Sequence, residues 1–482
     1  MGGVIFFYLA TLMLSVALCK MRVLAVAIAT VGYIMALINF LTKSLMEAHV
    51  SYFILSRVDM TMLEMAPVVV PVYFYGGIIC TVLLLYGQYR LIGYMKKRSL
   101  KTRTKLILGV IAVLVLGFST TTKAFVGTCM TAQKIHAQTN LSLDEVKQRL
   151  SLGDYTGEVG VTAKPGKNLV VIYLESLENN FLDENRFPIE MANFHRLQSE
   201  GWYTYDNYLC GYGSGWTTGG LFSTQTGMPT MFGGNRGIFL LESNTQAVTY
   251  GKVLREAGYQ NVFLSNSNLS FASTGAMLEA FGYQTFGGED FAPEIERTRW
   301  GAHDAQVFAK AKEEYQRLAK EGQPFHLAIL TVDTHYPDGF PDPAMRDYVD
   351  ERIPSDSHEY VVATLDYLVG DFVRFIEAQP GGKDTVIVLM NDHLMMHKKD
   401  RASIVDKLKD KPRHNLLLTN RPIEGFAQTD EIVFWDMPKI ILSLAGVTHN
   451  ARFPIDCIPD MTEKYIKDNE VLFTICNMKM LY

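Results

Sequence analysis

Apolar residues are unevenly distributed along the 482-residue chain, with long stretches before residue 126 and only short runs after residue 165. Four of the long stretches approach the roughly 20 residues that an α-helix needs to cross a bilayer. They run from about Val4 to Cys19, Val23 to Leu41, Ala66 to Leu85 and Leu106 to Phe118, and the first and last are short. The pattern predicts four membrane-spanning helices within residues 1–125.

Lysine and arginine are concentrated in two of the three segments that separate these predicted helices. The basic residues lie after the first stretch and before the fourth, and they are Lys20, Arg22, Arg90, Lys96, Lys97, Arg98, Lys101, Arg103 and Lys105. The segment from Met46 to Glu64 contains Arg57 as its only basic residue. Because cytoplasmic loops carry an excess of Lys and Arg, we expect both termini to lie outside the cytoplasm.

Beyond residue 165 the apolar runs shorten to strand length and alternate with segments of helical pattern. Three near-continuous apolar runs, at 168–174, 325–332 and 384–390, are typical of strands that are buried on both faces of a sheet. Helical patterns cover 246–257 and 304–318, with a strand-like run at 261–264 between them. This alternation predicts an α/β domain with helices on both faces of the sheet.

The segment 126–165 separates the two kinds of sequence and is expected to be a connector. Ser142 and Glu145 have the spacing of a capping box, and Val146 and Leu150 provide an apolar side for a short amphipathic helix. The expected parts are a transmembrane domain at 1–125, the connector at 126–165 and a folded domain at 166–482.

The three predicted strands each end in residues that can bind a metal ion or transfer a proton. Glu175 follows the first strand, His335 follows the second, and Asp392 and His393 follow the third. The ligand crevice of an open α/β sheet lies at the carboxyl ends of its strands, so these side chains are expected at one edge. Carboxylates and imidazoles bind divalent ions, and Glu175, Asp392 and His393 would supply three ligands. Glu178 is an alternative to Glu175, although it lies farther from the strand end.

Thr217 lies in the glycine-flanked segment Gly215-Trp-Thr-Thr-Gly219 and is the candidate nucleophile. A free hydroxyl is a weak nucleophile at neutral pH, but coordination to a divalent ion lowers its pKa. The adjacent Thr218 is the alternative. A helix is expected to begin near Leu221, and its unpaired N–H groups would favour a bound phosphate.

Short motifs around these residues match a known family. The chain resembles the membrane phosphoglycerol transferases of the sulfatase and alkaline phosphatase superfamily. The likeness is closer to the enzymes that modify periplasmic glucans than to lipoteichoic acid synthase. The shared motifs lie within about residues 165–450 and are Tyr173-Leu-Glu-Ser-Leu-Glu178, Gly215-Trp-Thr217, Ser270-Phe-Ala272, Phe281-Gly-Tyr283, Trp300-Gly-Ala-His-Asp304, His335-Tyr-Pro337 and Asn391-Asp-His-Leu394.

The resemblance implies a fold and a metal site. The implied fold is an N-terminal transmembrane α-helical bundle followed by an α/β sulfatase-like domain with a mixed, mostly parallel central sheet. One divalent ion is implied, in the first place Mn²⁺, with Mg²⁺ or Zn²⁺ as alternatives. Its ligands by resemblance are Glu175, Thr217, Asp392 and His393.

The resemblance also implies a reaction, which is transfer of phosphoglycerol from phosphatidylglycerol to hydroxyls of a periplasmic or cell-envelope glycan. Thr217 would be covalently substituted, and His335 would donate and accept the proton. Trp216, His303 and Asp304 are further candidates for substrate binding. The implied location is the bacterial inner membrane, as a multi-pass protein whose catalytic domain faces the periplasm.

The chain departs from several related enzymes at their motifs, which reduces the number of candidate reactions but leaves alternatives open. Ala272-Ser-Thr274 stands where lipoteichoic acid synthase has Trp-x-Arg, and the Cys-x-Pro-x-Arg signature of formylglycine sulfatases is not apparent. A phosphoethanolamine transferase would usually have Asp-His-Gly-Glu, whereas Leu394 follows His393 here. The sequence is also compatible with a sulfatase-like phosphodiester hydrolase and with a non-catalytic membrane sensor.

Composition adds few constraints. Hydrophobic residues make up 48% of the chain, mean hydropathy is +0.07 and net charge is −5. Because the predicted cytoplasmic loops are basic, the remainder is more acidic than average, and nothing indicates a nucleic-acid surface. Four cysteines lie outside the predicted spans, and either a Cys457–Cys476 disulfide or unpaired thiols are expected.

Overall fold

A computed structural model describes residues 2–45, 49–55, 67, 71–98, 100–153, 155, 160–231, 245–291, 298, 300–335, 339–395, 404, 407–408, 412–458 and 460–481. Contacts divide the chain into two compact units, which we call the helical unit, up to residue 140, and the sheet unit, formed by the described residues after 140.

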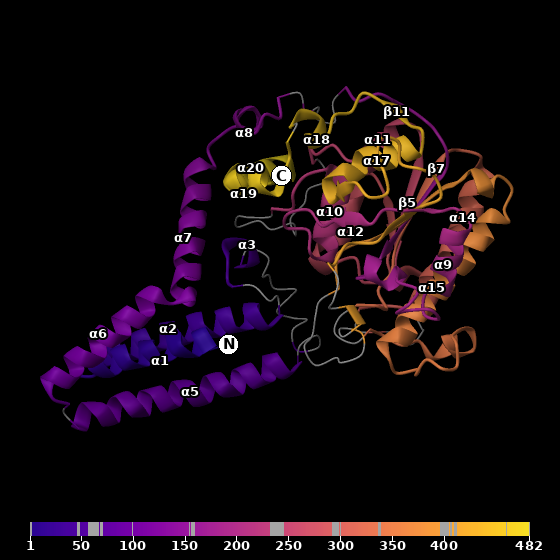
Figure 1. Cartoon of the computed structure of the whole chain (residues 1–482). Coiled ribbons are helices and arrows are strands. Elements are labelled where there is room, and N and C mark those ends of the chain that lie inside the picture. Colours follow the sequence, from indigo (N-terminus) through magenta and orange to yellow (C-terminus); the bar gives the residue numbers. More distant parts are fainter. Residues whose placement is uncertain are drawn as a thin grey trace. The chain divides into compact units, whose positions relative to one another are not determined.

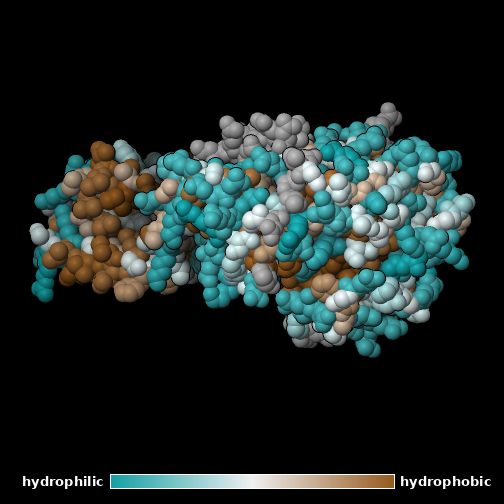
Figure 2. All heavy atoms as spheres, turned by 90° about the horizontal axis from the view of Figure 1, so that it is seen from above, coloured by the Kyte–Doolittle hydropathy of each residue, from teal (hydrophilic) through white to brown (hydrophobic). Residues whose placement is uncertain are grey.

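The helical unit is built from the apolar N-terminal part of the chain (Figure 1). Its helices are α1 (Gly2–Ala17), α2 (Arg22–Leu45), α3 (Tyr52–Leu55), α5 (Pro71–Arg98), α6 (Thr102–Phe118) and α7 (Thr120–Gln138). Large apolar side chains such as Phe6, Val82, Leu83 and Phe118 are exposed on it, and Figure 2 shows these hydrophobic surfaces in brown. Such a surface suits contact with lipid rather than water.

Each of the four predicted spans overlaps one of these helices, but their lengths differ from the prediction. Within the described residues, Arg22–Ser44 and Val72–Arg98 are long and apolar enough to cross a membrane. The pair α6 and α7 is bent by 59° and would make a third span if it crosses as one. Helix α1 is shorter, so the count of four spans stays a prediction.

Two details of the N-terminal half differ from expectation. Helix α5 continues to Arg98, so Arg90 and Lys96 lie on a helix and not in a loop. Long basic side chains can extend from the end of a helix toward water, so the helix can continue beyond its apolar segment. Helix α7 extends into the expected connector as far as Gln138, and it begins where Ser119 Oγ accepts a hydrogen bond from Thr121 N at 3.2 Å.

Close packing and inter-helix hydrogen bonds hold the helical unit together. A Cβ placed at Gly32 of α2 would lie 2.5 Å from Thr11 of α1, so these helices approach closely, as small residues permit. Tyr33 OH lies 2.8 Å from Thr81 Oγ1 and ties α2 to α5. Asn39, fully buried, donates to Thr121 Oγ1 at 2.9 Å and ties α2 to α7.

The sheet unit contains a seven-stranded, mostly parallel sheet. Its strands, in spatial order, are β3 (Tyr203–Thr204), β9 (Leu417–Thr419), β8 (Val386–Asn391), β2 (Leu169–Leu174), β7 (Phe325–Leu330), β5 (Gln260–Ser265) and β6 (Gln284–Phe286). Only the pairings of β9 with β8 and with β3 are antiparallel. Tyr173 of β2 is in register with Leu330 of β7 and Met390 of β8, so the three central strands end together. The predicted mixed sheet is confirmed.

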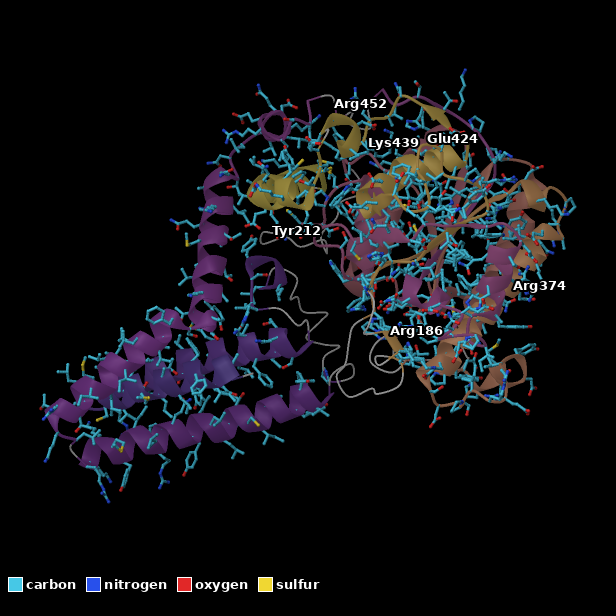
Figure 3. All side chains as sticks on the ribbon, viewed as in Figure 1. Arg186, Tyr212, Arg374, Glu424, Lys439 and Arg452 are labelled. Atoms are coloured by element: carbon cyan, nitrogen blue, oxygen red, sulfur yellow. The ribbon has the colours of Figure 1, made fainter. Side chains whose placement is uncertain are left out.

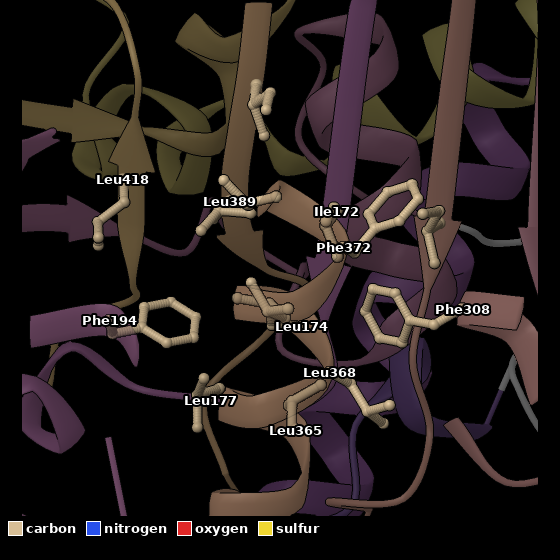
Figure 4. Close-up of a cluster of buried hydrophobic side chains, with 14 of the residues drawn as sticks. Ile172, Leu174, Leu177, Phe194, Phe308, Leu365, Leu368, Phe372, Leu389 and Leu418 are labelled. Atoms are coloured by element: carbon tan, nitrogen blue, oxygen red, sulfur yellow. The ribbon is translucent and has the colours of Figure 1, made fainter. Parts of the chain in front are cut away.

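Alternate residues of β2 pack against different helical layers, because side chains alternate across a strand. Ile172 and Leu174 face α9 (Ala192–Ser199), α14 (Asp304–Glu321) and α15 (His358–Glu377), where Figure 4 shows Phe308, Leu365 and Phe372 around them. Tyr173 faces the opposite layer, where its hydroxyl lies 3.0 Å from that of Tyr250 in α11 (Tyr250–Glu256). The labelled Arg374 in Figure 3 donates to Asn193 Oδ1 at 2.8 Å and joins α15 to α9.

Smaller elements complete the sheet unit. They are α8 (Leu143–Arg149), β1 (Ala163–Lys164), β4 (Asn207–Leu209), α10 (Thr217–Thr226), α12 (Thr274–Ala280), α13 (Gly288–Phe291), β10 (Glu431–Val433), α17 (Met437–Leu444), β11 (Thr448–His449), α18 (Pro454–Cys457), α19 (Glu463–Asp468) and α20 (Glu470–Leu481). The expected capping box is confirmed at α8, where Ser142 N donates to Glu145 Oε2 at 2.7 Å and Glu145 N to Ser142 Oγ at 3.2 Å. All six cysteines are within the described residues and none is in a disulfide, so the alternative of a Cys457–Cys476 bridge is not realised.

Candidate metal and nucleophile site

Glu175 lies at the end of β2 in a turn with strained backbone. The next residue, Ser176, has φ of 56°, which non-glycine residues adopt at a cost of about 1 kcal/mol or more. Ser176 Oγ donates to Glu175 Oε1 at 2.6 Å, and Ser176 N donates to Asp392 Oδ1 at 3.0 Å. Ser176 therefore connects the ends of two strands, a role that nothing in the sequence pattern indicated.

Asp392 and His393 follow β8 directly and meet Glu175 at the sheet edge, as the strand pattern predicted. Ligand atoms of the three buried residues all lie within 4.8 Å of one another. His393 Nε2 is 3.3 Å from Glu175 Oε1 and 3.5 Å from Asp392 Oδ2. His393 Nδ1 lies 2.8 Å from the Leu394 carbonyl oxygen, which orients Nε2 toward the carboxylates.

Thr217 occupies the first position of α10 and adds a hydroxyl to this group. Its Oγ1 lies 3.3 Å from Glu175 Oε2 and 3.4 Å from His393 Nε2. Thr218 instead points at Thr274, with 3.0 Å between the two hydroxyl oxygens. The geometry thus brings Thr217, and not its neighbour, next to the candidate ligands. The helix begins four residues before the expected Leu221.

Glycines in α10 explain how this helix comes so close to the backbone of Asp392. A Cβ at Gly220 would lie 2.0 Å from the Asp392 carbonyl oxygen, and one at Gly219 would lie 2.4 Å from Trp216 Nε1. The Trp216 indole donates from that nitrogen to the Gly213 carbonyl at 3.1 Å. The absence of side chains at both positions is what permits the packing.

We expect Gly220→Ala to disrupt the site, because the new methyl group would force α10 away from the backbone of Asp392. Overpacking of this kind costs about 1–3 kcal/mol of folding stability. Displacing a nucleophile by about 1 Å costs on the order of 100-fold in rate. Thermal unfolding and turnover of the variant measure both effects.

Gly215→Ala is the matched control, since a Cβ there meets nothing within 4 Å and the residue does not have a positive φ. Equal loss of activity in both variants would contradict the packing explanation.

Glu178, the alternative ligand, belongs to a separate ion pair. Its buried carboxylate accepts from Arg413 Nε at 3.1 and 2.9 Å. Arg413 also donates to the Met395 carbonyl, two residues after His393. Glu178 and Arg413 therefore fix Met395, just after the candidate ligands, and do not join the cluster of ligand atoms.

His335 follows β7, as predicted, on a loop fastened to Glu175. Thr331 Oγ1 accepts from Glu175 N at 3.0 Å, and Thr334 Oγ1 donates to the Glu175 carbonyl at 2.5 Å. The His335 ring packs against Trp300 with 4.7 Å between ring centroids. The charge of a protonated His335 lowers the pKa of the Glu175 carboxyl.

His303 and Asp304 form a buried network beneath that loop. Asp304 Oδ1 accepts from Val332 N at 2.8 Å and from Asn266 Nδ2 at 2.7 Å, while His303 Nδ1 lies 3.1 Å from Asp333 Oδ1. Burial and the neighbouring Asp333 raise the pKa of Asp304. These contacts fix the backbone after β7; the predicted substrate contacts of Trp216, His303 and Asp304 stay predictions.

The charges in the ligand cluster are strongly coupled. Burial and the Glu175 charge raise the pKa of Asp392 to about 8. Although burial opposes it, Asp392 and Glu175 raise the pKa of His393 to about 10. Burial likewise opposes the lowering of the Glu175 pKa, which His393 and His335 bring about. At neutral pH, Asp392 and His393 therefore both stay protonated when no other cation is bound.

The donor set fits a divalent metal ion. Asp392 Oδ2 is buried and makes no hydrogen bond within the described part of the chain, although such atoms are normally paired. Two carboxylates, one imidazole and one hydroxyl converge on the same volume. Hard and borderline divalent ions accept this combination of oxygen and nitrogen ligands.

Curated proteins of known name are similar to this chain in sequence. Phosphoglycerol transferase I of Salmonella choleraesuis (strain SC-B67) is 31% identical over 300 residues, which cover 57% of this chain and 39% of that protein. The Salmonella arizonae phosphoglycerol transferase I is 33% identical over 275 residues, 53% of this chain and 36% of its own. The chain therefore matches well under half the length of these curated relatives.

The fold has solved counterparts. The crystal structure of the lipoteichoic acid synthase LtaP from Listeria monocytogenes has a TM-score of 0.51 and 18% identity, and the match covers 66% of this chain and 82% of that one. The family model described as Sulfatase matches residues 167–426, more than half of the chain. The resemblance inferred from the motifs is confirmed, and the chain belongs to the sulfatase family.

Proposed function

We propose that this protein transfers phosphoglycerol from phosphatidylglycerol to a hydroxyl of a cell-envelope glycan through a covalent Thr217 intermediate. The observation that carries the proposal is the position of Thr217 Oγ1, 3.3 Å from Glu175 and 3.4 Å from His393 at the sheet edge. The names of the curated relatives favour phosphoglycerol as the transferred group.

The proposal includes one divalent ion, in the first place Mn²⁺, with Mg²⁺ or Zn²⁺ as alternatives. Glu175, Thr217, Asp392 and His393 would hold it. Such an ion supplies positive charge that lowers the pKa of a hydroxyl and neutralises charge on a phosphate oxygen. The surrounding residues orient these side chains. Ser176 donates hydrogen bonds to the carboxylates of Glu175 and Asp392, and the Leu394 carbonyl lies against the His393 imidazole.

We expect metal binding to release about one to two protons at pH 7, because Asp392 and His393 have raised pKa values of about 8 and about 10. A metal binds the deprotonated forms, so affinity should increase as pH rises from 6 to 9. Calorimetric titration of Mn²⁺ at one pH in two buffers of different ionisation enthalpy measures the proton count. Identical heats in both buffers would contradict the expected release.

The proposed reaction has two displacements at phosphorus. In the first, Thr217 Oγ forms a bond to phosphorus as the bond to the diacylglycerol oxygen breaks; Thr217 gives its proton to solvent, and His335 gives one to the diacylglycerol oxygen. In the second, the glycan hydroxyl oxygen forms a bond to phosphorus as the bond to Thr217 Oγ breaks. His335 accepts the proton of the glycan hydroxyl, and Thr217 Oγ takes a proton from solvent.

The apolar helices support a location where the lipid donor is available. We propose the bacterial inner membrane, crossed more than once, with the sheet unit on the periplasmic side. The support for this orientation is the distribution of basic residues, since Arg22 and the cluster from Lys96 to Lys105 lie at the predicted cytoplasmic ends. A lipid donor then presents its headgroup on the same side as Thr217.

The test uses the purified full-length protein in vesicles that contain phosphatidylglycerol, with Mn²⁺ and periplasmic glucan as acceptor. The proposal predicts diacylglycerol release together with phosphoglycerol-modified glucan. Free glycerophosphate without acceptor would identify a hydrolase, and turnover of phosphatidylethanolamine instead would identify a phosphoethanolamine transferase. Absence of any turnover and of metal binding would favour a non-catalytic protein.

A further inference from the structure

We propose that Trp300 is a positioning residue for the proton-transfer step, and that it acts by holding the ring of His335. This inference deepens the proposed function, because it rests on the role given there to His335. Trp300 is not assigned a contact with substrate. Its expected influence is on the rate of the chemical step and not on lipid binding.

The ring contact is direct. The Trp300 and His335 ring centroids are 4.7 Å apart with an angle of 46° between the planes. Phe271 packs against Trp300 with its centroid at 5.1 Å and an interplanar angle of 73°. Aromatic pairs at such separations are attractive beyond the area they bury. The indole is thus packed between a phenyl ring and the imidazole.

The backbone of Trp300 is fixed on several sides, so its ring provides a firm support. Trp300 N donates to Thr298 Oγ1 at 3.1 Å, and its carbonyl accepts from Asn268 N at 3.1 Å. The next residue, Gly301, has φ of 153°, and a Cβ there would lie 1.8 Å from the Asn266 carbonyl oxygen. Only glycine fits this close approach. The approach fixes the position of the Trp300 backbone, from which the indole extends.

The same short segment also fixes the backbone that carries His335. Asp304 Oδ1 accepts from Val332 N at 2.8 Å, and Asp304 N donates to Asp333 Oδ2 at 2.9 Å. His335 N in turn donates to the Val332 carbonyl at 2.9 Å. Trp300 therefore constrains the imidazole ring while Asp304 constrains the loop, two contributions that mutation can separate.

The contacts that hold Trp300 continue to α10, the helix that begins at Thr217. Phe271 begins a short helical turn in which Ala272 and Ser273 have φ of 52° and 50°, a strained conformation for non-glycine residues. Thr274 Oγ1 donates to the Phe271 carbonyl at 2.9 Å and lies 3.0 Å from Thr218 Oγ1. Hydrogen bonds and ring contacts thus run from the first turn of α10 to His335.

The test compares Trp300→Leu with Trp300→Phe, each alone and combined with His335→Gln. For Trp300→Leu we expect kcat to fall by about 10- to 100-fold while KM for the lipid changes less than about twofold. Trp300→Phe keeps an aromatic ring and should recover most of kcat. In the His335→Gln background, Trp300→Leu should have almost no further effect, because the group it positions is gone.

An equal loss of kcat in both backgrounds, or a rise in KM without a fall in kcat, would overturn the proposal. A second readout does not depend on turnover. In full-length protein labelled at histidine, the ring current of the indole should shift the His335 imidazole NMR signal, assigned through His335→Gln. The shift should disappear in Trp300→Leu and persist in part in Trp300→Phe; an unchanged signal in Trp300→Leu would also overturn the proposal.

The two readouts separate this inference from the proposed function. If the wild type fails to transfer phosphoglycerol, the proposed function fails, and the NMR comparison still decides whether Trp300 holds His335. If transfer occurs but Trp300→Leu leaves kcat unchanged, only the positioning role fails.

Discussion

Thr217→Ala should reduce phosphoglycerol transfer by at least about 1,000-fold, because it removes the hydroxyl that lies 3.3 Å from Glu175 Oε2 and 3.4 Å from His393 Nε2. Thr217→Ser keeps a hydroxyl and should retain part of the activity. The initial rate of diacylglycerol release from phosphatidylglycerol vesicles measures both effects.

Thr218→Ala is the matched control, since it removes a hydroxyl from the adjacent position. The Thr218 hydroxyl is hydrogen-bonded to that of Thr274. Loss of this hydrogen bond should lower the free energy of unfolding by about 1 kcal/mol and leave most of the transfer rate. If Thr218→Ala were inactive and Thr217→Ala active, the assignment of the nucleophile would be wrong.

Asp392→Asn should remove metal-induced stabilisation while leaving the metal-free protein as stable as the wild type or more so. An asparagine can still accept hydrogen bonds from Ser176 N and His393 N at the Oδ1 position. It is neutral, like the protonated Asp392 that a raised pKa of about 8 implies for the metal-free protein at pH 7, and it cannot ionise to bind a metal. Thermal unfolding with EDTA and with excess Mn²⁺ measures the difference.

Glu178→Gln offers a contrast at a second buried carboxylate. It weakens the pair with Arg413 and should cost about 2 kcal/mol both with and without metal, leaving the metal-induced shift intact. A full metal-induced shift in Asp392→Asn would contradict the ligand assignment. Loss of the metal-induced shift in Glu178→Gln, together with its retention in Asp392→Asn, would contradict the assignment as well.

The positions of the three candidate ligands, Glu175, Asp392 and His393, were predictable because they depend on local pattern. Apolar strands that are buried on both faces are recognisable in sequence, and parallel strands in register bring the residues after Leu174 and Asn391 to one edge. Prediction of the mixed sheet itself came from the resemblance to the superfamily.

Other features could not be predicted, because they depend on contacts between distant segments. The requirement for glycine at residue 220 arises from the Asp392 carbonyl, and the role of Ser176 arises from the Asp392 carboxylate. Nothing in the local sequence indicates either contact. Helix α10 begins at Thr217 and not near its first large apolar residue, Leu221, because packing against the site stabilises the preceding turn.

The central claim is that Thr217 becomes covalently substituted with phosphoglycerol. Intact-mass spectrometry of the full-length protein, incubated with phosphatidylglycerol and Mn²⁺ without acceptor, tests it most directly. The account predicts an adduct of phosphoglycerol mass on the wild type, located at Thr217 by peptide mapping, absent in Thr217→Ala and lost when glucan is added. Transfer of phosphoglycerol to glucan without an adduct under rapid quenching, or an adduct that persists in Thr217→Ala, would contradict it.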